Sequence, residues 1–142
     1  MSTVAFYAPL KPPDDPVPSG DRTMARSLLA ALREADIFVL PSRIASDGDR
    51  DGLPNVLMEA ASQELPILST SVSSIPEFIE NGKQGVLVEP DAGELASALA
   101  KMIADPEDRA AFGVAARQRL VKHFGMDAGI DTLVARLRNA LG

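Results

Sequence analysis

Two carboxylates, Asp51 and Glu59, are separated by seven residues and flank the predicted start of a helix. The apolar run 37–41 before them is too short for a helix and indicates a buried parallel strand. The loop between is polar and contains glycine, and Pro54 is expected at the first helical position, where proline loses no hydrogen bond. Unpaired N–H groups and the positive dipole end of that helix would point into the loop. This order of strand, loop and helix start predicts a site for an anionic ligand.

Other groups near this loop could contact the same ligand. Ser42 and Arg43 directly follow the strand, at its carboxyl end, where open α/β sheets bind ligands. Gly52 and Leu53 would offer backbone N–H groups to a phosphate or a sugar, whereas Pro54 has none to give. Each feature also has an ordinary interpretation, because an arginine here can simply be solvated and many α/β loops have this composition.

The segment 51–60 resembles the acidic-x7-Glu signature of retaining, nucleotide-sugar-dependent glycosyltransferases of the GT-B type, the large family-four group. The segments 65–67, 73–77 and 81–90 resemble the next segments of that family in the same order. The resemblance implies a Rossmann-like α/β fold. It also implies transfer of a hexose-type sugar from a nucleotide-diphosphate sugar to an acceptor.

The resemblance assigns roles to the two carboxylates. Asp51 would contact hydroxyls of the transferred sugar and is the catalytic candidate, although aspartate is one methylene shorter than the glutamate that is commoner there. Glu59 would bind the ribose hydroxyls, a task that suits a carboxylate because it accepts two hydrogen bonds from a diol. Without the resemblance, Asp51 could be an ordinary loop aspartate and Glu59 a solvated helix carboxylate.

One part of the family pattern has no counterpart in this sequence. Family members carry an arginine and a lysine that clamp the diphosphate, and metal-independent members need that positive charge on the leaving group. The candidate cations stand in other sequence contexts: Lys11, Arg22, Arg26, Arg43 and Arg50. We therefore expect this short form to be inactive or weakly active alone.

The resemblance also divides the chain. Residues 35–142 resemble the second half of a donor-binding domain, whereas residues 1–34 resemble the strand, loop and helix that open an acceptor domain. We interpret the sequence as an internally deleted or truncated member that forms one compact domain over residues 1–142, in line with the usual size of domains.

Composition excludes several other functions. The formal net charge of −6 argues against nucleic acid or an anionic membrane as a partner. The sequence has no cysteine, one histidine and no calcium-type spacing of aspartates, so neither a metal site nor a cofactor is predicted. Glu77 is expected at the start of a helix, where the helix dipole stabilises its negative charge. His123 is expected at the end of a helix. Without an apparent signal peptide or an apolar run long enough to span a membrane, the expected location is the cytoplasm.

The pattern along the chain predicts strands alternating with helices, which is typical of an α/β fold with a parallel sheet. About four strands should lie side by side in chain order, followed by C-terminal helices. The predicted strands are 4–8, 37–41, 66–69 and 86–88. The predicted helices begin near residues 22, 54, 75, 91, 106 and 127, and the one that begins at residue 75 is expected to end at residue 80. Asp91 with Glu94 is expected to form a capping box, and Asp105 is expected to cap the helix after it.

Self-association is the alternative to catalysis. The connecting helices should cover one face of the sheet, which leaves the other face to the C-terminal helices or to a second copy of the chain. An uncovered apolar face marks an interface, so the sequence predicts a homodimer. The alternative function is thus a non-catalytic, self-associating module with at most weak nucleotide binding. A related GT-B epimerase fits the motif spacing less well.

Overall fold

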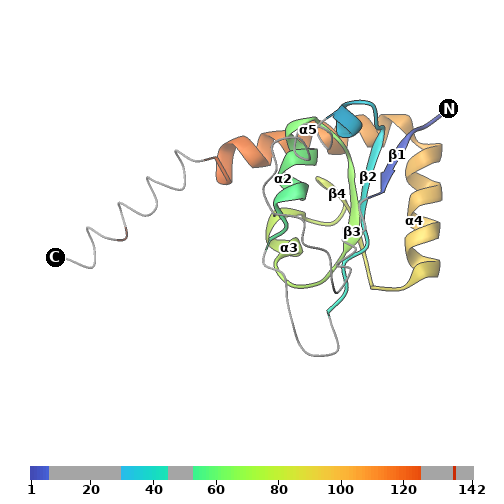
Figure 1. Cartoon of the computed structure of the whole chain (residues 1–142), viewed down its shortest axis with the longest axis horizontal. Coiled ribbons are helices and arrows are strands. Elements are labelled where there is room, and N and C mark those ends of the chain that lie inside the picture. The colour runs from blue at the N-terminus through green and yellow to red at the C-terminus, as the bar shows by residue number, and fades with distance from the viewer. Residues whose placement is uncertain (7–29, 45–52, 126–135, 137–142) are drawn as a thin grey trace, which may run out of the picture.

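A four-stranded parallel sheet forms the centre of the protein (Figure 1). The structure, a computed structural model, describes residues 1–6, 30–44, 53–125 and 136. The strands are β1 (Val4–Phe6), β2 (Ile37–Leu40), β3 (Ile67–Thr70) and β4 (Gly85–Val88), and they lie side by side in chain order. The α/β fold, the parallel sheet and the strand order predicted from the sequence are confirmed.

Helices cover both faces of this sheet. They are α2 (Asn55–Ser62), α3 (Ile75–Phe78), α4 (Ala92–Ala104) and α5 (Pro106–His123). Figure 1 shows α2 and α3 on one face and α4 on the opposite face, while α5 passes the end at which the strands begin. Of the two predicted covers for the second face, the C-terminal helices or a second copy, the structure shows the first, because α4 lies on it.

The core consists of two clusters, one on each face. Alternate residues of the fully buried strand β2 face opposite sides, so Phe38 and Leu40 join the cluster under α2 and α3, whereas Ile37 and Val39 join the cluster under α4. Burial on both faces explains why β2 is a continuous apolar run rather than an alternating one. In the first cluster, α5 packs on α2 and contributes Ala116.

The structure confirms some of the predicted helix caps and helix limits. Asp91 caps α4 by accepting from the N–H groups of Gly93 and Glu94 at 2.8 and 2.9 Å, and Asp105 caps α5. The capping box also predicts that the side chain of Glu94 accepts from the N–H of Asp91. This prediction is wrong, because Glu94 accepts from the N–H of Glu89 at 3.2 Å. The start of α2 is wrong by one residue, since Pro54 is the N-cap, and α3 is two residues shorter than predicted. The predicted final helix lies almost entirely outside the described residues.

The outer edge of β4 is blocked by side chains. Asn81 Oδ1 accepts from the N–H of Leu87 at 3.0 Å, and Glu94 Oε2 accepts from the N–H of Glu89 at 3.2 Å. Both are backbone groups that an added strand would otherwise use. Pairing of a second sheet with this edge is therefore disfavoured. Among the described residues, none of the helices is both long and apolar enough to cross a membrane.

Acid is expected to weaken the attachment of α3 to α5 through Glu80. Lys83 Nζ donates to Glu80 Oε2 at 2.5 Å, and Arg119 pairs with the other carboxylate oxygen. The hydrogen bond and the charge of Lys83, followed by the charge of Arg119, hold the pKa of Glu80 below its usual value. The pairs thus stabilise the fold at pH above the unfolded-state pKa of about 4.3, and this contribution is lost as the pH falls through the lower folded-state pKa.

Urea unfolding measured across this acid range checks the effect. The midpoint should fall less steeply with pH for Glu80→Gln than for the unmodified chain, and the difference should be small because the carboxylate is partly exposed. Glu34→Gln, an exposed glutamate near the beginning of β2, is the matched control and should leave the slope unchanged. A slope for Glu80→Gln equal to that of the unmodified chain contradicts the prediction.

Candidate functional site

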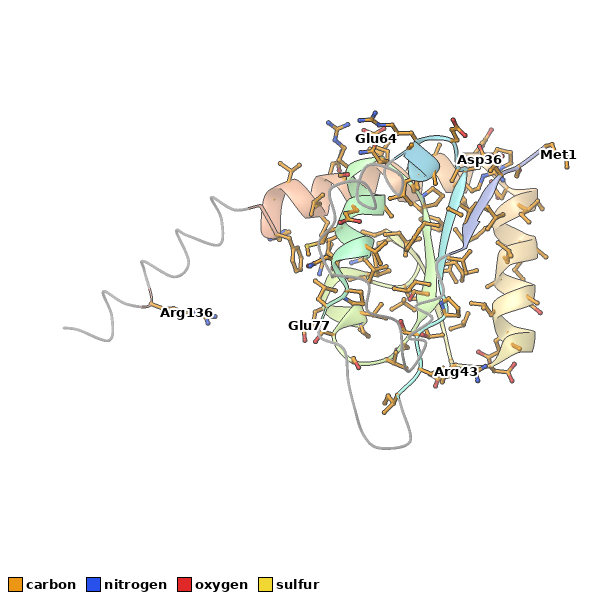
Figure 2. All side chains as sticks on the ribbon, viewed as in Figure 1. Met1, Asp36, Arg43, Glu64, Glu77 and Arg136 are labelled. Carbon is orange, nitrogen blue, oxygen red and sulfur yellow. The ribbon has the colours of Figure 1, made fainter. Side chains whose placement is uncertain are left out.

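The ligand edge of the sheet is where β2 and β3 end. Both strands are parallel and hydrogen-bonded neighbours, so the segments that follow Leu40 and Thr70 emerge at one edge. Figure 2 shows Arg43 at this edge, at the opposite end of the molecule from Asp36 and Glu64. Ligands of open α/β sheets bind at the carboxyl ends of the strands. Ser42 and Arg43 follow the end of β2 at this edge, and their contact with a ligand stays a prediction.

No side chain of the described residues caps the start of α2. Pro54 has φ −65° and ψ 122°, an extended conformation, and its carbonyl accepts from the N–H of Leu57 at 3.0 Å. Its side chain cannot cap the helix, and the first turn contains no acidic residue. The N–H groups of Asn55 and Val56 thus have no partner among the described residues. Free N–H groups at the positive end of a helix suit an anion.

Glu59 lies one turn into α2, next to the buried face formed by Val56, Leu57, Ala60 and Ala61. Its side chain is half-buried. Its carboxylate forms no ion pair or hydrogen bond with any other described residue. The backbone carbonyl of Glu59 accepts from Ser62 Oγ at 2.6 Å, a local bond within the helix. A half-buried carboxylate without a described partner is available to accept hydrogen bonds from a ligand.

The remaining predicted residues have different environments. Ser42 is half-buried, and Arg43 is exposed without an ion-pair partner in the described part of the chain. The side chain of Leu53 packs against the core, which gives it a structural role beside any contact of its backbone. Asp51 and Gly52 lie outside the described residues. His123 is the exposed last residue of α5, as predicted for a helix-end histidine.

Two features of this edge gave no signal in the sequence. Thr70 Oγ1 donates to the carbonyl of Ser42 at 2.6 Å, although a hydroxyl in an apolar run does not reveal its partner. Ser73, in the turn that leads to α3, has φ 50°, a left-handed conformation in which glycine is the usual residue. The sequence at 73–74 is Ser-Ser, so a search for glycines at turns misses it. Glu77 lies in the first turn of α3 as predicted.

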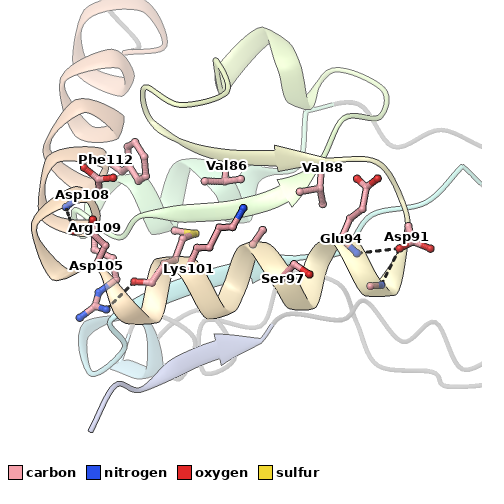
Figure 3. A pocket seen from close by; sticks show the side chains of 13 residues that line it. Val86, Val88, Asp91, Glu94, Ser97, Lys101, Asp105, Asp108, Arg109 and Phe112 are labelled. Atoms are coloured by element: carbon pink, nitrogen blue, oxygen red, sulfur yellow. Dashed lines mark hydrogen bonds between the residues drawn. The ribbon is translucent and has the colours of Figure 1, made fainter.

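A groove of about 740 Å³ lies between β4, α4 and the start of α5. Figure 3 shows Val86 and Val88 pointing toward α4, and Lys101 reaching up beside them. Of the residues predicted for the ligand site, those that the structure describes do not line this groove. The described residues contain no cluster of three side chains that could ligate a metal.

The comparisons with known proteins identify the family. The family model described as "Glycosyl transferases group 1" matches residues 20–105, more than half of the chain. The chain belongs to the group 1 glycosyltransferases. A curated relative, the "Putative colanic acid biosynthesis glycosyltransferase WcaL" of Salmonella typhimurium, is 42% identical over 101 residues. The match covers 70% of this chain and 25% of the relative, so this glycosyltransferase chain spans about a quarter of the length of that protein.

Solved structures show the same fold. Sucrose-phosphate synthase from Thermosynechococcus elongatus superposes with a TM-score of 0.64 at 26% identity, over 79% of this chain and 28% of that one. HepE from Anabaena, solved in complex with UDP, superposes with a TM-score of 0.65 at 21% identity, over 77% of this chain and 29% of that one. The Rossmann-like arrangement expected of a GT-B protein is confirmed.

Proposed function

We propose that this chain is the donor-binding part of a glycosyltransferase that moves a hexose-type sugar from a nucleotide-diphosphate sugar to an acceptor. The observation that carries the proposal is the half-buried carboxylate of Glu59, placed one turn into α2, whose first N–H groups have no partner among the described residues. Family membership and the UDP complex of HepE support a nucleotide sugar as the ligand. Neither the family nor the UDP complex of HepE identifies the acceptor.

Each part of the ligand matches a group of the site. Glu59 would accept hydrogen bonds from the ribose hydroxyls, and Asp51 would act on the transferred sugar as the catalytic residue. The N–H groups at the start of α2, together with Gly52 and Leu53, would receive phosphate or sugar oxygens, with Ser42 beside them. Arg43 is the exposed cation of the described ligand edge and would oppose the charge of the diphosphate.

The stereochemistry and the metal requirement belong to the same proposal. We infer a retaining transfer because the spacing of Asp51 and Glu59 matches the signature of retaining enzymes. We infer metal independence because helix-start N–H groups and an arginine can stabilise the departing diphosphate without a metal ion. A single arginine replaces an expected pair of cations, so activity of the chain alone should be weak.

Binding of donor sugars tests the proposal. UDP- and GDP-linked hexoses should raise the melting temperature of the chain, since a ligand at a hundredfold excess over its Kd adds about 2.7 kcal/mol to the free energy of unfolding. Glu59→Gln should weaken donor binding at least about tenfold, because hydrogen bonds to a charged group contribute about 1.5–3 kcal/mol. Isothermal titration calorimetry measures the change in Kd.

Glu34→Gln makes the same change of charge near the beginning of β2 and should bind the donor like the unmodified chain. Two results contradict the proposal: no donor binds the unmodified chain, or Glu59→Gln binds it equally well.

A self-associating module remains the second candidate, and exposed apolar side chains on α5 favour it. Val114 and Val121 are 45% and 68% exposed and lie two turns apart on one side of the helix. A homodimer through this helix would leave the ligand edge free. Sedimentation of the calorimetry samples reports the oligomeric state. Residence in the cytoplasm and the division of the chain at residue 34 stay predictions from the sequence.

A further inference from the structure

Two buried hydroxyls at the end of β3 bind the chain where it leaves β2. Ser69 Oγ donates to the carbonyl of Leu40 at 2.7 Å, and Thr70 Oγ1 donates to the carbonyl of Ser42 at 2.6 Å. Ser69 and Thr70 are 0% and 2% exposed. The bond of Ser69 lies within the ladder, where Leu40 is its register partner. The bond of Thr70 reaches two residues beyond the last residue of β2.

Backbone bonds do not hold this part of the chain to β3. Pro41 has no N–H group to donate. The N–H of Ser42 turns back to the carbonyl of Leu40 at 3.0 Å, and the carbonyl of Thr70 accepts from the N–H of Val72 at 2.9 Å. Both groups that would extend the ladder are therefore used locally. The hydroxyl of Thr70 takes over the attachment of Ser42.

We propose that Thr70 is a positioning residue of the donor site. Its hydroxyl fixes the carbonyl of Ser42 and with it the backbone from which Arg43 extends at the ligand edge. This inference rests on the proposed function, because Arg43 is the group that would meet the diphosphate. Thr70 itself is buried beneath Ser42 and acts through that residue without touching the ligand.

Ser69 provides a matched control, because it is also a buried hydroxyl of β3. The carbonyl of Leu40 that it binds already accepts the N–H of Ser42, and it lies inside the strand. Removing the hydroxyl of Ser69 thus leaves Ser42 attached to β3 through Thr70. A general loosening of the sheet would appear in both variants, whereas loss of positioning would appear only in the variant of Thr70.

Hydrogen exchange tests the positioning without any donor. In Thr70→Val, which keeps the shape of the side chain, the amide of Ser42, which donates to the carbonyl of Leu40 at 3.0 Å, should exchange about tenfold faster, as expected when one hydrogen bond that holds a segment is lost. Ser69→Ala should leave the exchange of this amide unchanged, and Thr70→Ser should restore slow exchange. Unchanged exchange in Thr70→Val overturns the inference whether or not a donor binds.

Titration with UDP-linked and GDP-linked hexoses tests the consequence for the site. Thr70→Val should raise the Kd of the donor several-fold. Adding Arg43→Ala to Thr70→Val should raise the Kd only slightly further, because an arginine that is already displaced contributes less to donor binding. Independent, additive effects of the two substitutions overturn the role in the donor site. If the unmodified chain binds no donor, the proposed function fails, and the exchange experiment still decides whether Thr70 positions Ser42.

Discussion

Replacing Gly113 by alanine is expected to destabilise the protein by about 3 kcal/mol, at the upper end of the usual cost of overpacking. An added Cβ would lie 1.9 Å from the carbonyl oxygen of Glu64 and 2.8 Å from its carbonyl carbon. The conflict is between two backbones, so no side chain can rotate to relieve it. Helix α5 would have to move away from the end of α2, to which it packs. Urea unfolding of both proteins measures the loss.

The propensity of alanine for helices works in the opposite direction and makes the test decisive. In an exposed helix interior, alanine is favoured over glycine by about 1 kcal/mol. Ala110→Gly, at an exposed position of the same helix, measures the difference in helix propensity alone and should lower the free energy of unfolding by about 1 kcal/mol. If Gly113→Ala is as stable as the unmodified chain, the close approach of α5 to Glu64 is wrong.

The sequence predicted most of the fold because many of its signals are local. The caps of α4 and α5 were found because Asp91 and Asp105 bind N–H groups two or three residues away. The central strands β2 and β3 were found because each begins as a short apolar run that is buried on both faces. A predicted element ends where such a local signal ends, which explains the small errors at Pro54 and at the end of α3.

The contacts that hold the elements together were not predictable in this way. Gly113 and Glu64 are far apart in the sequence, and neither residue type indicates that two backbones meet there. Glu64 has φ 57°, a left-handed conformation that glycine usually adopts. A glutamate at this position therefore does not indicate the turn that it forms. The hydrogen bond of the Thr70 hydroxyl was unpredictable for the same reason, because only the register of β2 and β3 places this hydroxyl beneath Ser42.

The candidate site was predicted to the extent that it depends on one strand, one loop and one helix. The order of these elements predicts that Ser42 and Arg43 follow β2 at its carboxyl end and that Glu59 lies one turn into α2, as the structure shows. That these residues form one site stays a prediction. The positions of Asp51 and Gly52 depend on a loop outside the described residues, so their roles rest on the family pattern. The side chain of Leu53 was missed as a core residue, because its sequence context is that of a loop.

Phe78→Ala is expected to cost about 3–5 kcal/mol, the usual loss when a buried phenylalanine leaves a cavity. Phe78 is 0% exposed, and it is the main anchor of α3, a helix of only four residues. Its ring meets that of Phe124 edge to face, with centroids 4.9 Å apart and planes at 87°. Phe124 is half-buried and directly follows α5. The pair therefore joins the segment beside the ligand edge to the end of the last described helix.

A double-mutant cycle separates this pairing from burial. Phe124→Ala should cost less than Phe78→Ala, and the double variant should recover about 0.5–1.5 kcal/mol of the summed losses, the contribution of an aromatic pair beyond its buried area. Phe112→Ala, in the cluster on the opposite face, is the control and should add to Phe78→Ala without coupling. Full additivity of the Phe78 and Phe124 variants would show that the rings fill space independently. In that case Phe78 anchors α3 through its own burial, beside the bond that Arg119 donates to the carbonyl of Glu77 at 2.8 Å.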